Sequence, residues 1–136
     1  MNYIKLLPLI IMLCNACAKE ESYIPSVSVK EEWSLSHPWL SALNNTGTSV
    51  VVPGGVAGII IYRTASGGYM AFDRCSTVNP AKKCAVVANG TSIATDPCSG
   101  ANYSLANNGS SGKAPAITPL KRYYVSVDEF SITITN

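Results

Sequence analysis

Cysteines are the main candidates for chemistry in this sequence, which has five of them and a single histidine. The segment DPCSGANYSL, residues 96–105, has the outline of a metal-binding loop, but it contains one sulfur and no imidazole. His37 lies far from this loop in the sequence, beside Pro38 and Trp39, where we expect it to pack or to face solvent. The sequence therefore predicts neither a metal site nor a Ser/His/Asp catalytic set, which favours a protein without enzymatic activity but leaves the question open.

The first sixteen residues have the pattern of a secretory signal peptide. The apolar run Leu6–Leu13 is too short to span a bilayer. Ala16 precedes Cys17, and this arrangement resembles a bacterial lipobox, in which the cysteine is acylated and becomes the first residue of the mature protein. Cys14 fits less well, because a bulky leucine would stand at its cleavage site. We therefore expect residues 1–16 to be removed and Cys17 to be the lipidation site.

A polar tether is expected over residues 17–26, which contain few apolar side chains and Pro25. The run Lys19-Glu20-Glu21 resembles the acidic surface-export signals of some Gram-negative lipoproteins. The expected location is therefore the cell envelope, with the protein anchored by lipid and with the outer membrane as the favoured membrane.

The charge balance argues against a nucleic-acid partner. The formal net charge is +2, and the basic residues are scattered, with Lys82-Lys83 and Lys121-Arg122 as isolated pairs. Hydrophobic residues make up 47% of the chain and charged residues only 13%, so the chain can fold around an apolar core.

Residues 27–136 are predicted to form one all-β domain, a small antiparallel sandwich or barrel. Two β-branched runs, Val50–Val52 and Ile59–Ile61, are separated by proline and glycines. Asn89-Gly90 is a strong signal for a tight turn, and the closing run RYYVSVDEFSITIT predicts two more short strands. Only HPWLSALNN, residues 37–45, is expected to form a turn or a single helical turn.

Two loops are predicted at one tip of this domain, and the residues around them resemble the Rieske [2Fe–2S] family. In that family a strand ends in a Cys-x-His loop, and a hairpin then leads to a Cys-x-x-His-Gly loop followed by an aromatic residue. A Pro-Ala…Pro-Leu segment and a Tyr-x-Val strand pair close the domain. The matching positions in this chain are Cys75, Gly100, Tyr103, Leu105, Pro115-Ala116, Pro119-Leu120, and Tyr123 or Tyr124. The resemblance covers residues 27–136 and implies a Rieske-like fold.

The sequence departs from this family at the positions of the cluster ligands. A Rieske cluster takes two thiolates and two imidazoles. Cys75 stands at the first cysteine position, but Thr77 stands at the first histidine position. The register that matches Gly100 and Tyr103 puts Asp96 at the second cysteine position and Ser99 at the second histidine position. A register that uses Cys98 as the ligand puts Ala101 at that histidine position instead. Both registers lack the two histidines, so we expect no bound cluster, with a [2Fe–2S] cluster of unusual ligation as the alternative.

Three cysteines, Cys75, Cys84 and Cys98, remain in the domain, and an exported protein folds in an oxidising compartment. An odd number allows at most one internal disulfide. Some Rieske proteins carry an extra cysteine where Cys98 stands, bonded across to the first loop, so the resemblance favours Cys75–Cys98 with Cys84 as a third thiol. A Cys84–Cys98 or a Cys75–Cys84 pair is also open, because geometry decides the pairing.

These observations predict a membrane-anchored lipoprotein with a Rieske-like fold that acts as a binding or structural module of the cell envelope. Its expected partners are the membrane, through the lipid, and an envelope protein. The alternative functions are electron transfer through an atypical cluster and a thiol–disulfide redox element that uses Cys75 and Cys98.

Overall fold

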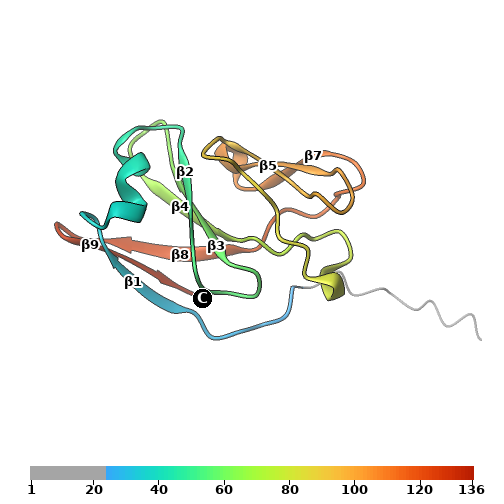
Figure 1. Cartoon of the computed structure of the whole chain (residues 1–136), viewed down its shortest axis with the longest axis horizontal. Coiled ribbons are helices and arrows are strands. Elements are labelled where there is room, and N and C mark those ends of the chain that lie inside the picture. The colour runs from blue at the N-terminus through green and yellow to red at the C-terminus, as the bar shows by residue number, and fades with distance from the viewer. Residues whose placement is uncertain (1–23) are drawn as a thin grey trace, which may run out of the picture.

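The computed structural model describes residues 24–136, which form an all-β domain (Figure 1). Its strands, in chain order, are β1 (Lys30–Ser34), β2 (Ser49–Val52), β3 (Ile59–Arg63), β4 (Tyr69–Asp73), β5 (Ile93–Thr95), β6 (Asn102–Ser104), β7 (Ser110–Lys113), β8 (Arg122–Val127) and β9 (Ser131–Thr135). Three short 3-10 helices join them: η1 (Pro38–Asn44), η2 (Pro80–Lys82) and η3 (Leu105–Asn107). The expectations for residues 1–16 and for Cys17 concern positions outside this described part.

The strands form two antiparallel sheets. Six strands follow the order β1-β9-β8-β4-β3-β2, and three follow the order β5-β6-β7. The small sheet packs against one face of β3 and β4, with which it shares a core (Figure 1), and the strand composition confirms the predicted all-β class. None of the helices within residues 24–136 has the length and apolar character needed to cross a membrane.

Strand β3 is buried on both faces, which explains its uninterrupted apolar sequence. Ile60 and Tyr62 belong to the core that lies under the small sheet, together with Phe72 of β4. Ile59 and Ile61 point to the other face, where they join a second core with η1, β8 and β9. The two cores hold β3 and β4 in place, and the loop that follows β4 leaves from this rigid centre.

The turn at Asn89-Gly90 has the predicted local geometry. Both residues have positive φ, and the Thr91 N–H donates to the Ala88 carbonyl at 2.9 Å. On either side of this turn, Val87 and Thr95 form an antiparallel bridge. The turn therefore brings the chain back from the segment after β4 to β5.

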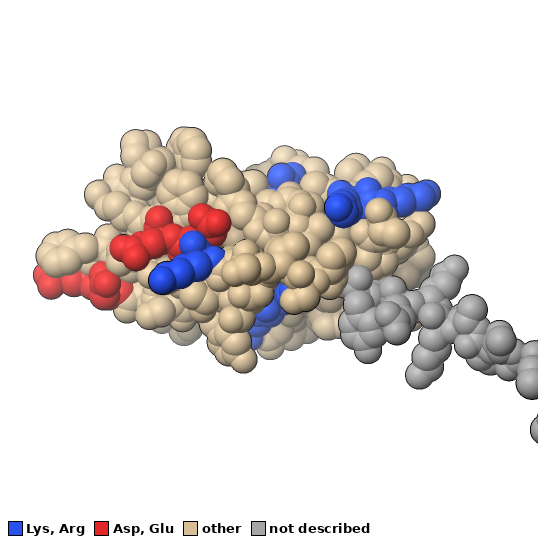
Figure 2. Space-filling model, turned by 90° about the horizontal axis from the view of Figure 1, so that it is seen from below, with Lys and Arg blue, Asp and Glu red and all other residues tan. Residues whose placement is uncertain are grey.

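Charge is distributed unevenly along the domain. In residues 24–136 the carboxylates that are not buried are those of Glu31, Glu32, Asp128 and Glu129. Figure 2 shows acidic side chains gathered at the end formed by β1 and the β8–β9 turn, with a basic side chain beside them, while other Lys and Arg side chains occur elsewhere, including the opposite end. The surface therefore has an acidic end that lies away from η2 and the loops around it.

Candidate functional site

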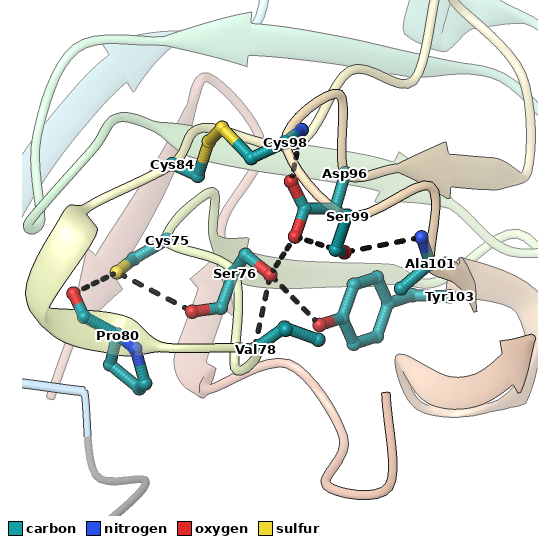
Figure 3. Close-up of a disulfide and its surroundings, with 10 residues drawn as sticks. All are labelled: Cys75, Ser76, Val78, Pro80, Cys84, Asp96, Cys98, Ser99, Ala101 and Tyr103. Carbon is teal, nitrogen blue, oxygen red and sulfur yellow. Dashed lines mark hydrogen bonds between the residues drawn. A yellow bond between two sulfur atoms is a disulfide. The ribbon is translucent and has the colours of Figure 1, made fainter. Parts of the chain in front are cut away.

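The candidate site is a pair of loops, residues 75–85 after β4 and residues 96–101 between β5 and β6, which we call the loop pair (Figure 3). The first loop folds back on itself: Cys75 forms a bridge with Ala85, and the Ser76 N–H donates to the Cys84 carbonyl at 2.8 Å. The second loop turns at Gly100, whose φ is +77° and whose N–H donates to the Asp96 carbonyl at 2.8 Å. A positive φ explains why a glycine stands there.

A disulfide between Cys84 and Cys98 joins the two loops, with a Cα–Cα distance of 6.4 Å. The expectation of one disulfide that involves Cys98 is confirmed, but the favoured Cys75–Cys98 pairing is wrong. Successive side chains in extended chain point to opposite faces. Since Cys75 lies opposite Ala85, the neighbouring Cys84 points the other way, toward the second loop, as Figure 3 shows.

The third thiol is therefore that of Cys75, which is fully buried. Its Sγ lies 3.6 Å from the Pro80 carbonyl oxygen and 3.8 Å from that of Ser76. Burial, together with the negative charge of nearby Asp73, raises the pKa of this thiol to about 11. Cys75 is consequently a protonated thiol at neutral pH, and a thiol in that state is a poor nucleophile and a poor metal ligand.

Asp96 lies at the centre of the loop pair, and its side chain is completely buried. Its carboxylate accepts hydrogen bonds from Ser76 Oγ at 2.6 Å, Ser99 Oγ at 2.7 Å and the Cys98 N–H at 2.8 Å. Burial alone would raise the pKa of this carboxyl, but the hydrogen bonds from Ser76, Ser99 and the backbone hold it below its usual value. Asp96 is therefore an anion that the two loops enclose and stabilise by hydrogen bonding.

Thr77, at the first histidine position, is also engaged within the protein. Its Oγ1 donates to the Thr118 carbonyl at 2.7 Å and lies 2.9 Å from the hydroxyl of the buried Tyr103. The Tyr103 hydroxyl also accepts the Thr77 N–H at 3.1 Å and contacts Ser76 Oγ at 3.1 Å. These bonds tie the first loop to β6 and to the segment that contains Pro119.

A second buried carboxylate, that of Asp73, holds the base of the first loop and was not singled out from the sequence. It accepts hydrogen bonds from Val56 N at 2.6 Å, Cys75 N at 2.7 Å, Ala57 N at 3.2 Å and Tyr123 Oη at 2.6 Å. Burial and the contact with Asp73 raise the pKa of Tyr123 well above its ordinary value. In the sequence, the one feature that could have pointed to this buried carboxylate is its place as the acidic last residue of the otherwise apolar run YMAFD.

His37 lies outside the loop pair and packs as expected. Its Nδ1 accepts the Trp39 N–H at 3.2 Å at the start of η1. The imidazole centroid lies 5.3 Å from that of Trp33 and 5.0 Å from that of Trp39.

The structure brings the four positions that the resemblance assigns to the cluster, Cys75, Thr77, Asp96 and Ser99, into one region, but their side chains do not fit a Rieske cluster. They offer a buried protonated thiol, two hydroxyls and a carboxylate whose oxygens are already hydrogen-bonded, whereas such a cluster takes two thiolates and two imidazoles. The ligand atoms of Cys84, Asp96 and Cys98 do lie within 4.8 Å of one another. The two sulfur atoms of that group are bonded to each other.

Comparison with known proteins supports the fold. No protein-family model and no curated protein sequence matches the chain. Among solved structures, the plasma membrane Rieske protein PetC3 from Synechocystis PCC 6803 superposes with a TM-score of 0.56 at 22% identity, covering 82% of this chain and all of that one. The ferredoxin of carbazole 1,9a-dioxygenase from Nocardioides aromaticivorans IC177 gives a TM-score of 0.51 at 16% identity, covering 81% of this chain and 98% of its own. The described residues of this chain therefore have the Rieske fold.

Proposed function

We propose that this protein is a Rieske-fold binding or structural module of the cell envelope that works without an iron–sulfur cluster. The observation that carries the proposal is the state of Asp96. This carboxylate stands where a thiolate ligand would be required, and it is already bonded to Ser76, Ser99 and the Cys98 backbone. A buried charge that loses such partners is strongly destabilised, so binding iron there would require breaking the network that holds the loops.

The disulfide supplies the link that a cluster would otherwise provide between the two loops. Cys84 and Cys98 connect loops that come from opposite sides of the Asn89-Gly90 turn. A cross-link of this kind limits the freedom of the unfolded chain and holds both loops in one arrangement. The resulting tip is a rigid surface that can serve recognition.

Electron transfer through an atypical cluster is the second candidate, and the grouping of Cys84, Asp96 and Cys98 favours it. Reduction of the disulfide by a dithiol would turn its two sulfurs into thiols, and these thiols lie beside a carboxylate. The thiol–disulfide element that uses Cys75 has less support, because the raised pKa of that thiol disfavours exchange at neutral pH.

Absorption spectroscopy and an iron assay on the purified chain distinguish these functions. We expect a colourless protein without stoichiometric iron, even after expression with iron–sulfur assembly machinery. Under native conditions we expect no free thiol at Cys84 or Cys98. A brown protein with a Rieske-type paramagnetic signal would refute the proposal. Stoichiometric iron, together with Cys84 and Cys98 that react as thiols only after the iron is removed, would establish the second candidate.

We further propose that residues 1–16 are a signal peptide and that a lipid on Cys17 anchors the protein to the outer membrane. The described chain begins at the end that carries η2 (Figure 1). Residues 17–23 can span roughly 25 Å when fully extended, so such an anchor would keep the loop pair close to the bilayer. Lys82 and Lys83 are exposed at this end, and the acidic end would point away from anionic headgroups (Figure 2).

Substitution of the proposed lipidated cysteine tests this anchor. Cys17→Ala is expected to move the protein from the membrane fraction to the soluble fraction, because a single substitution removes the acceptor of every acyl chain. Cys14→Ala is the matched control and is expected to leave the protein in the membrane. Fractionation followed by a carbonate wash measures the distribution, and a Cys17→Ala variant that still sediments with membranes would refute the lipid anchor.

A further inference from the structure

A hollow of about 650 Å³ lies outside the loop pair, against the edge strand β2. The residues that line it come from η1, β2 and the segments next to β3 and β4: Trp39, Val50, Val51, Val52, Pro53, Gly58 and Arg74. We call this hollow the β2 groove. Its size is within the range of small-molecule sites, which are usually lined by apolar side chains with a few polar groups.

The apolar wall of the β2 groove is partly exposed. Trp39 has 55% and Val51 has 45% of its surface open to solvent. The Trp39 ring is supported from behind, since its centroid lies 5.4 Å from that of Trp33 and 5.0 Å from that of His37. An aromatic ring held in this way offers a fixed apolar surface to a ligand at little cost in conformational entropy.

Arg74 is the one charged residue that lines the β2 groove. Its Nε donates to the Val86 carbonyl at 3.0 Å, which fixes the plane of the guanidinium and leaves its terminal nitrogens available. Within residues 24–136 it forms no ion pair with a carboxylate, and its side chain makes one hydrogen bond, the one to Val86. A partly buried guanidinium without an anionic partner suits a carboxylate ligand.

Gly58 makes room for this arginine. A Cβ at that position would lie 3.0 Å from Arg74 Cδ, and the φ of +99° disfavours any other residue. The position of the guanidinium is thus fixed by the backbone as well as by its hydrogen bond.

We propose that the β2 groove binds a small apolar anion, namely a carboxylate that carries an aliphatic or aromatic body. The body lies against Trp39 and the valines of β2, and the carboxylate pairs with Arg74. This inference gives a ligand class to the binding module proposed above and rests on that function. Its test does not depend on iron. A cluster in the loop pair would refute the proposed function, whereas a β2 groove that binds no ligand would refute only this inference.

The test compares octanoate with 1-octanol, which have the same chain length and differ in charge. The full chain is held in nanodiscs of neutral lipid, tryptophan fluorescence is followed during titration, and empty nanodiscs are subtracted. Octanoate is expected to bind roughly tenfold or more tightly than octanol, since a charge-assisted hydrogen bond distinguishes them. This comparison needs no variant. Equal affinities, or no saturable signal at millimolar ligand, would overturn the proposal.

Variants then test the separate roles of the arginine and of the apolar wall in the β2 groove. Arg74→Gln is expected to abolish the preference for octanoate, Arg74→Lys to retain most of it, and Trp39→Ala to weaken both ligands. Arg122→Gln, an exposed arginine on β8, is the matched control and is expected to change neither affinity. Circular dichroism checks that each variant folds. Retention of the preference in a folded Arg74→Gln variant would refute the role of Arg74, and saturable binding of an acidic peptide in place of octanoate would refute the small-anion proposal.

Discussion

Replacement of Asp96 by alanine is expected to destabilise the domain by about 3 kcal/mol at neutral pH, because the buried Ser76 hydroxyl and the partly buried donors of Ser99 and the Cys98 backbone lose their acceptor. Asp96→Asn keeps the shape and one acceptor oxygen, so a smaller loss of about 1–2 kcal/mol is expected. Chemical denaturation followed by tryptophan fluorescence measures both free energies of unfolding.

The same carboxylate makes the stability depend on pH. The pKa of Asp96 in the folded protein is held below its usual value. Its contribution is therefore complete above the unfolded-state pKa of about 4 and is lost as the pH falls through the folded-state pKa. The wild type is expected to lose more stability than Asp96→Asn between pH 7 and pH 3, so that the two free energies of unfolding converge in acid.

Asp128 is the matched control, because its pKa is also lowered, by hydrogen bonds from the Phe130 and Ser131 backbone, but its carboxyl is fully exposed. Asp128→Asn is expected to change the free energy of unfolding little at any pH. Parallel pH profiles for the wild type and Asp96→Asn would show that the Asp96 carboxylate contributes nothing to the folded state.

The large sheet could be predicted in good part from the sequence, because its strands carry their own signals. β2 and β3 are β-branched runs, and β8 and β9 alternate apolar and polar residues. β1 gave no such signal, since KEEWS contains one apolar residue. It forms because β9 offers it a complete antiparallel partner, a tertiary effect that local propensity does not contain.

The sequence predicted which segments form the candidate site, but it did not predict the disulfide pairing or the hydrogen bonds within it. The order of Cys75, Gly100 and Tyr103 indicated a Rieske-like pair of loops, and the structure brings those loops together. The cysteine pairing depends on which face each side chain of the first loop occupies, and a register shift of one residue reverses that face. The network around Asp96 depends on Ser76 and Tyr103, ordinary residues whose role appears only when the loops meet.

Loss of the disulfide is expected to destabilise the domain by roughly 3 kcal/mol, the value for a closed loop of about 15 residues; the two cysteines here are 14 positions apart. Cys84→Ser and Cys98→Ser should show similar losses, and the double variant should lose no more than either, because both substitutions remove one bond. The sheets should remain folded, since the two cores do not include these residues. Thermal melts and denaturant titrations measure the losses.

Cys75→Ala separates this effect from simple packing of sulfur. It removes a buried thiol that makes no covalent bond, so its smaller loss should add to that of Cys98→Ser rather than coincide with it. Mass spectrometry under non-reducing conditions should find one peptide pair cross-linked through Cys84 and Cys98. A Cys75–Cys98 cross-link would show that the first loop presents its other face to the second loop. Additive losses for Cys84→Ser and Cys98→Ser would mean that hydrogen bonds, and not a covalent bond, hold the two loops together.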